Sequence, residues 1–197
     1  MVATSEISVR VYFESANGLR RPMKSFLRRG LGSMNGRLEL VAGGGREQTI
    51  SVFRTALSQH RYSFLILLLD SEVGYHDGLR SEIKRKLRAK IRHDQVFWMV
   101  QAMEAWFLAD RQTLRDYYGG GFKEKALRAN PNVETIPKLD LLRSLNDATR
   151  KTGPGAYLDN KAAHAIELLS KLRPVPVRAA APKCEELFQV LTQKLVR

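Results

Sequence analysis

Four acidic side chains follow closely behind apolar segments of this chain. They are Glu14, Asp70, Glu72 and Glu104. Clustered carboxylates repel one another unless a cation lies between them, and a site of oxygen ligands alone favours Mg²⁺ or Mn²⁺ over Zn²⁺. If folding brings the four acids together, the sequence predicts a divalent-metal site. An acid-x-acid pair such as Asp70 and Glu72 equally suits a solvated strand end, so the surrounding elements must decide.

The charge of the chain indicates the substrate on which such a site would act. Among 197 residues there are 33 Lys and Arg against 20 Asp and Glu, a formal net charge of +13. A basic excess of this size suggests a polyanionic partner, with nucleic acid ahead of an anionic membrane. Metal-assisted phosphodiester hydrolysis combines the two features. Glu14 is then the candidate general base, and Lys or Arg side chains steady the developing charge.

Four segments have the pattern of β-strands and would position these acids. Segment 7–13 alternates apolar and polar residues, which predicts a strand. Segment 64–69 is apolar throughout, as in a strand that a parallel sheet buries on both faces. Shorter apolar segments at 38–42 and 96–100 complete the set. Ligands of open α/β sheets bind at the carboxyl ends of parallel strands, so we expect the acids to converge on one edge.

Helical patterns separate these segments and fill the rest of the chain. We expect helices near 19–29, from Glu47 onward, and over an apolar stripe between 79 and 91. No strand pattern follows residue 100. The prediction is one α/β domain with about four mostly parallel strands flanked by helices. Its sheet core spans 1–112, and a helical C-terminal portion, 113–197, covers one flank of the sheet.

Basic residues on the predicted helices are candidates for contacts with a phosphate backbone. The helix after residue 79 lacks aromatic residues that would anchor it in a bilayer, although a solvated surface helix has the same pattern. Arg46 follows three glycines between a strand and a helix, where N–H groups can receive a phosphate; a plain tight turn is at least as consistent. The candidate phosphate or nucleic-acid contacts are Arg20, Arg21, Arg46, Lys84, Arg85 and Arg88.

Glu104 has two possible roles. The segment around it is too apolar for a surface helix, so it should pack under the sheet with Glu104 near a strand end. A buried glutamate must be paired, bound to a cation or protonated. Glu104 is therefore either a metal ligand or the partner of a buried base.

Cysteine usage and hydropathy indicate the compartment. The single cysteine, Cys184, excludes an internal disulfide framework and a multi-cysteine metal site. The first residues lack the basic and apolar regions of a signal peptide, and no apolar run approaches the roughly 20 residues of a membrane span. We expect a cytoplasmic protein without a membrane segment.

The acid pattern resembles the Toprim domain of topoisomerases, primases and nucleases related to the overcoming-lysogenization-defect family. More closely, the chain looks like an uncharacterised bacterial Toprim-like domain-of-unknown-function family. The matching pieces are Val11–Glu14, Leu69–Glu72, Met99–Asp110, Asn130-Pro131, Lys138, Tyr157, Lys161 and His164. The box at 99–110 is the most specific of them. Two departures stand out: Ser15 replaces the Gly that usually follows the first acid, and Glu72 replaces the usual second Asp.

This resemblance implies a nuclease that uses Mg²⁺ or Mn²⁺, with Glu14, Asp70, Glu72 and Glu104 as metal ligands. It makes Lys161 a candidate catalytic residue alongside Glu14, Asp70 and Glu72. Lys138 and His164 are further residues of interest, although a lone histidine is more often a surface or core-edge residue. The family also implies an AAA or ABC-type ATPase partner in phage-defence loci. Two alternatives remain: a non-catalytic module that binds nucleic acid or an ATPase, and a small-nucleotide phosphotransferase or phosphatase that uses 43–46 as a phosphate cradle.

Overall fold

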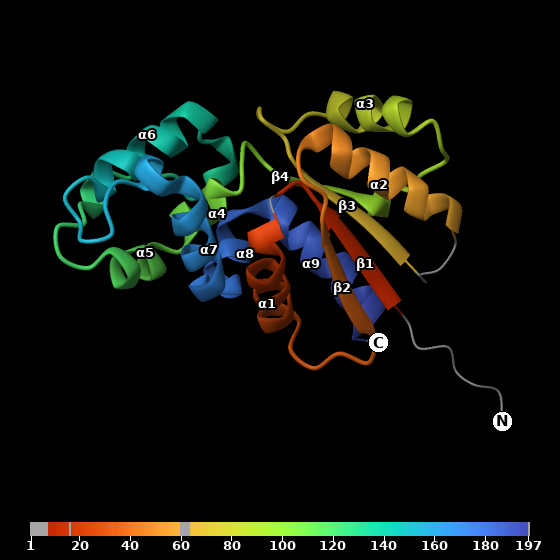
Figure 1. Cartoon of the computed structure of the whole chain (residues 1–197), viewed down its shortest axis with the longest axis horizontal. Helices are drawn as coiled ribbons and strands as arrows, with labels where there is room; N and C mark the ends of the chain where they lie inside the picture. The colour runs from red at the N-terminus through yellow and green to blue at the C-terminus, as the bar shows by residue number, and fades with distance from the viewer. Residues whose placement is uncertain (1–7, 16, 60–63, 197) are drawn as a thin grey trace.

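A four-stranded parallel sheet forms the centre of the protein (Figure 1). The computed structural model describes residues 8–15, 17–59 and 64–196. The strands are β1 Ser8–Phe13, β2 Arg37–Ala42, β3 Phe64–Asp70 and β4 Val96–Met99. Their order in the sheet is β2-β1-β3-β4. All four predicted strands are therefore confirmed, with residue 7 of the first lying outside the described residues.

The register brings the carboxyl ends of the strands level with one another. Phe13, the last residue of β1, lies opposite Ala42 and Leu68. Asp70, the last residue of β3, lies opposite Met99. The prediction that acids following β1 and β3 share one edge is correct, because adjacent parallel strands place their carboxyl ends side by side.

Helices cover both faces of the sheet. On one face, α2 (Arg46–Gln59) and α3 (Asp77–Leu87) pack residues such as Phe53 and Ile83 against the strands. On the other face lie α1 (Arg20–Leu31) and α9 (Pro182–Leu195), which contact each other through Phe26 and Phe188, with ring centroids 5.7 Å apart. Gly30 permits this approach, because a Cβ there would lie 2.3 Å from the Phe188 ring.

Helix α3 is shorter than its apolar stripe predicts. The stripe continues to Ile91, but the helix ends at Leu87 because Arg88 adopts a left-handed conformation (φ 49°). Arg88 closes the helix by donating its N–H to the Lys84 carbonyl at 3.2 Å. Such a left-handed residue is a common helix terminator.

The C-terminal portion is helical, as predicted. Its helices are α6 Lys138–Thr149, α7 Lys161–Lys171, α8 Pro174–Ala180 and α9. They are preceded by α4 Glu104–Ala109 and by α5 Arg111–Tyr118, which crosses the predicted boundary at residue 113. Helix α9 returns beneath the sheet, whereas α5 and α6 lie to one side of it (Figure 1). Buried residues of both portions, such as Val11, Trp106 and Leu145, belong to one hydrophobic cluster. Within the described ranges, no strand follows β4 and no helix combines the length and apolarity that a membrane crossing requires.

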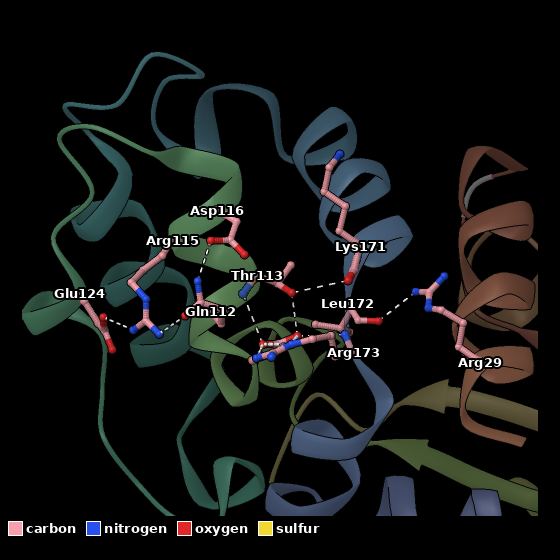
Figure 2. A network of polar contacts seen from close by, with 10 residues as sticks. Arg29, Gln112, Thr113, Arg115, Asp116, Glu124, Lys171, Leu172 and Arg173 are labelled. Atoms are coloured by element: carbon pink, nitrogen blue, oxygen red, sulfur yellow. Dashed lines mark hydrogen bonds and ion pairs between the residues drawn. The ribbon is translucent and has the colours of Figure 1, made fainter. Parts of the chain in front are cut away.

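Asp110 holds the C-terminal helices together at a fully buried position. Figure 2 labels its partners Thr113 and Arg173, and the nearby pair of Arg29 and Leu172. It caps α5 by accepting the Thr113 N–H (3.3 Å) and the Thr113 hydroxyl (2.7 Å). It also accepts the main-chain N–H of Arg173 at 2.9 Å and pairs with the Arg173 guanidinium. Nearby, Arg29 of α1 donates to the Leu172 carbonyl at 2.9 Å. These bonds fix the α7–α8 junction against α1 and α5, and so the position of α7 beside the sheet edge.

Candidate functional site: an acidic cleft at the carboxyl edge of the sheet

A cleft of about 540 Å³ opens at the carboxyl edge of the sheet. Its chemistry comes from Glu14 after β1, Asp70 at the end of β3, Glu104 at the start of α4 and Lys161 at the start of α7. Its remaining walls are Ser15, Leu19, Gly44, Gly45, Met103, Ala162 and Ala165. The sheet and the helical C-terminal portion thus both contribute charged groups to one cleft.

Asp70 lies among the other acids. Burial raises the pKa of its carboxyl well above the ordinary value, and repulsion from Glu104 and Glu14 raises it further. Lys138 opposes the shift without cancelling it. The carboxylate accepts a hydrogen bond from the Met103 main-chain N–H at 3.1 Å. Asp70 is therefore a carboxyl whose charge the surrounding protein disfavours.

Glu14 has a carboxylate oxygen in need of a partner. Its Oε2 is buried and makes no hydrogen bond within the described part of the chain. The closest base is Arg46, whose guanidinium nitrogen lies 3.8 Å from that oxygen. Burial raises the pKa of Glu14 in spite of Arg46. Arg46 is itself held by a 2.6 Å bond to the Asp70 carbonyl and lies over the Trp98 ring.

Glu104 is the partner of a base, one of the two roles that the sequence allows, although that base, Lys161, is half exposed rather than buried. It is 2% exposed, and its Oε1 accepts the Tyr157 hydroxyl at 2.8 Å. The same oxygen lies 2.8 Å from the Lys161 ammonium, whose side chain is half exposed at the cleft. Tyr157 and Lys161, two residues of the family resemblance, therefore both contact Glu104, which is a third. All three come from helices of the C-terminal portion or its boundary.

Glu72 lies beside the cleft rather than on its wall. Its side chain is half exposed and pairs with the Lys138 ammonium. Both Glu72 (φ 65°) and Gln101 (φ 64°) adopt the left-handed conformation, which is uncommon for residues other than glycine. The two are bonded, since the Glu72 N–H donates to the Gln101 carbonyl at 3.0 Å. These turns direct the chain away from β3 and β4 at the site.

Gln101 is a site residue that the sequence pattern does not reveal. Its side-chain oxygen accepts the main-chain N–H of Lys138 at 3.1 Å, which caps the start of α6. Its own N–H donates to the Ser71 hydroxyl at 2.7 Å. Gln101 thereby places Lys138 over the acids. Its position directly after a strand was the sole signal available in the sequence.

The cleft contains the oxygen-bearing side chains that hard cations prefer, but these side chains are not arranged as a complete metal site. Within the described ranges, no three Asp, Glu, His or Cys side chains are grouped so that they could hold a metal ion. Three of the four acids have a basic partner instead. These pairs are Glu14–Arg46, Glu72–Lys138 and Glu104–Lys161. The side chains that could bind a metal nonetheless all offer oxygen atoms. One of these oxygens, Glu14 Oε2, is buried without a hydrogen-bond partner, and the four acids outnumber their three basic partners by one.

The chain has a recognisable family. Residues 19–192 match the family model described as Domain of unknown function (DUF4276). The chain belongs to this family. The expected membership of a domain-of-unknown-function family is thus confirmed. Neither the curated proteins nor the solved structures include a significant match, so a relation to Toprim domains stays a prediction.

The glycine loop of this DUF4276 chain forms a tight turn, and two of its N–H groups are bonded within the protein. The Gly43 and Gly44 N–H groups donate to the carbonyls of Phe13 and Ser15, both at 3.0 Å. The Gly45 carbonyl accepts the Thr49 hydroxyl at 2.9 Å. Arg46, the predicted phosphate contact, turns toward Glu14 and the end of β3. Two of the N–H groups that a phosphate would need are therefore engaged.

His164 is a buried core residue, whereas the default interpretation was a surface or core-edge position. It is 3% exposed, and its Nδ1 lies 3.0 Å from the Tyr117 hydroxyl. Its ring also contacts Tyr118 and Tyr157. Burial lowers the pKa of His164, so the ring is neutral near pH 7. It does not line the cleft, although it lies three residues from Lys161.

The basic residues predicted for nucleic acid are distributed over two other surfaces. Arg20 and Arg21 line a hollow beside β2 together with Lys24 and Arg37. Arg85 and Arg88 face α2 across a groove, and Lys84 is exposed on α3. None of these side chains lines the acidic cleft.

Proposed function

We propose that this protein hydrolyses phosphodiester bonds of a nucleic acid with Mg²⁺ or Mn²⁺ bound in the acidic cleft. The observation that carries the proposal is Asp70. Its carboxyl lies at the end of a central strand, and burial with the neighbouring acids Glu104 and Glu14 raises its pKa. Neutralising that cluster is what a divalent cation would do, and a cation-bound carboxylate would recover its charge.

The roles of the side chains follow from their places. Asp70 and Glu14 would hold the ion, and Glu104 would join them when it is released from Lys161. When bound, the metal would polarise the phosphate and lower the pKa of a water molecule. Lys161, half exposed at the cleft, would neutralise the phosphate, and Lys138 would do so from the Glu72 side. Glu14 has a pKa raised by burial and a buried oxygen without a hydrogen-bond partner, and both features suit a general base.

The finer identity proposed for this enzyme is a Toprim-type nuclease. It is supported by acids that follow two adjacent parallel strands, β1 and β3, and by the helical residues Lys138 and Lys161 at the same edge. An AAA or ABC-type ATPase partner, a role in phage defence and a cytoplasmic location belong to the same proposal.

Cleavage by the purified protein tests the proposal. Plasmid DNA, single-stranded DNA and RNA are incubated with Mn²⁺, with Mg²⁺ or with EDTA. We expect metal-dependent cleavage that Asp70→Asn reduces by at least about a hundredfold, since a metal ligand contributes several kcal/mol to the transition state. The matched control is Asp147→Asn, which removes an exposed acid paired only loosely with Arg150 at 3.7 Å. Equal activity of the two variants would refute the role of Asp70.

The second candidate is a non-catalytic binding module. It is favoured by the basic partners of Glu14, Glu72 and Glu104, which could hold the cleft closed to metal. Two results together would support the binding module. No substrate would be cleaved, with or without a partner ATPase, and Asp70→Asn would bind nucleic acid as the native protein does. The engaged N–H groups of Gly43 and Gly44 give no support to a small-nucleotide enzyme, whose binding would also depend little on salt.

A further inference from the structure

A basic groove lies between α2 and the carboxyl-terminal end of α3. Two adjoining hollows form it, of about 600 Å³ and 520 Å³, and both are lined by Arg54 and Arg88. Arg85 adds a third guanidinium to the smaller hollow, and Lys90 and Arg92 line the larger one. Among the described residues, none that lines the larger hollow is acidic. The cations come from two separate segments, with Arg54 on α2 and the others within residues 85–92, so the tertiary structure brings the two groups together.

Most of these cations have no acid to neutralise them. In the described part of the chain, Arg54, Arg85, Arg88 and Lys90 are exposed and form no ion pair. Arg92 is the exception, since it pairs with Asp94 at 2.6 Å. Lys86 pairs with Glu47 and Glu82. Like charges held close together repel one another and destabilise the fold unless an anion offsets them.

We propose that this groove binds the phosphate backbone of a nucleic acid. Three of the four unpaired cations are arginines, whose planar guanidinium groups bind phosphate oxygens in pairs. The spacing of cations along a groove suits a chain of phosphates better than a single anion.

A lipid surface fits the groove less well. Membrane-binding helices present exposed apolar side chains to the bilayer. Here the large apolar side chains on the walls are mostly buried: Phe64 and Leu65 are each 7% exposed, Leu87 is 1% exposed and Leu57 is half-buried. The groove is also concave, whereas a bilayer surface is flat.

The groove is separate from the acidic cleft. Its larger hollow reaches Phe64 and Leu65 at the start of β3, whereas the cleft contains Asp70 at the end of the same strand. Six residue steps of a strand span about 20 Å. The groove would therefore hold a length of nucleic acid at a distance from the cleft. The inference does not depend on cleavage, because it stands whether or not the cleft is catalytic.

Equilibrium binding measured by fluorescence anisotropy tests the groove. The probes are a labelled DNA duplex and a labelled single strand of the same length, in EDTA so that no metal contributes. The groove variant is Arg54→Gln/Arg88→Gln/Lys90→Gln. The matched control is Lys125→Gln/Arg143→Gln/Lys151→Gln, which removes three exposed, unpaired charges from the C-terminal portion. Circular dichroism and thermal unfolding verify that both variants fold.

We expect the groove variant to bind at least one of the DNA probes at least about tenfold more weakly, with a salt slope lower by about 2 to 3. The control should change affinity less than about twofold. Equal losses in both variants would overturn the proposal, because binding would then follow net charge alone. Binding of anionic phosphatidylserine vesicles without binding of either DNA would overturn it as well. Binding is measured in EDTA, where the proposed metal-dependent cleavage does not occur, so failed cleavage and a failed groove remain distinguishable.

Discussion

Asp70 lies near the start of α4 and Asp110 lies at its end. The two acids have opposite surroundings. Asp110 is fully buried and receives two bonds from Thr113, a main-chain bond from Arg173 and its guanidinium. Burial alone would raise its pKa, but these donors bring the pKa below the ordinary value. Asp70 receives one N–H and is surrounded by acids, so its pKa rises.

The difference distinguishes an acid that stabilises the fold from an acid that serves function. A buried carboxylate whose oxygens are satisfied by several donors stabilises the fold as an ion. A carboxylate left beside other carboxylates weakens the fold when ionised and is retained where a ligand compensates. Linkage gives opposite pH dependence. The contribution of Asp110 is present above its unfolded pKa and is lost as pH falls. The contribution of Asp70 falls as pH rises.

Removal of Asp110 should produce the largest loss of stability. Asp110→Ala leaves the buried Thr113 groups and Arg173 N–H without an acceptor and removes the cap of α5. We expect unfolding free energy to fall by about 3 kcal/mol. Urea denaturation measures it. A loss smaller than that of the exposed control Asp147→Asn would contradict the architectural role.

Glu134 has surroundings intermediate between those of Asp110 and Asp70. This buried acid accepts the Lys183 N–H at 2.9 Å, and burial raises its pKa from 4.5 to about 7. A raised carboxyl pKa means that stability falls as pH rises between those two values. Glu134→Gln keeps an acceptor without the charge, so it should remove about 2 kcal/mol of that pH dependence. Thermal unfolding across this range measures it, and an unchanged slope would assign the pH dependence elsewhere.

Metal should stabilise the native protein through the cleft. At about ten times its dissociation constant, a ligand that binds only the folded state adds about 1.4 kcal/mol. We expect Mn²⁺ or Mg²⁺ to raise the thermal midpoint of the native protein and not that of Asp70→Asn. Ca²⁺-free buffers with EDTA provide the baseline. The same rise in both proteins would place the metal outside the cleft.

The smallest predicted effect is a gain in stability. Asp70→Asn keeps an oxygen for the Met103 N–H and removes the charge that Glu14 and Glu104 oppose. In EDTA near pH 8, we expect about 1 kcal/mol more stability than the native protein. Urea denaturation beside Asp147→Asn measures it. A loss instead would mean that the ionised Asp70 is itself structural, and the contrast with Asp110 would disappear.

The sequence pattern was sufficient for the strands and for the edge at which the acids meet. Side-chain periodicity identified β1, and continuous apolarity identified β3. Acids directly after parallel neighbours must lie at one edge, so Glu14 and Asp70 could be placed together. Periodicity failed at the end of α3, because the left-handed Arg88 stops the helix inside the apolar stripe. It also did not mark α8, whose seven residues include Pro174 and Pro176 in the first turn.

By itself, the sequence determined which residues face the core and which strand ends carry acids, since both depend on neighbours along the chain. The tertiary structure decided how each acid is neutralised. Whether Glu104 meets Lys161, Glu72 meets Lys138 or Asp110 meets Arg173 depends on residues more than fifty positions apart in the chain. The same holds for the groove, where Arg54 and Arg88 meet only because α2 and α3 pack on one face. Charge–charge energies depend on distance and burial, which no local pattern records.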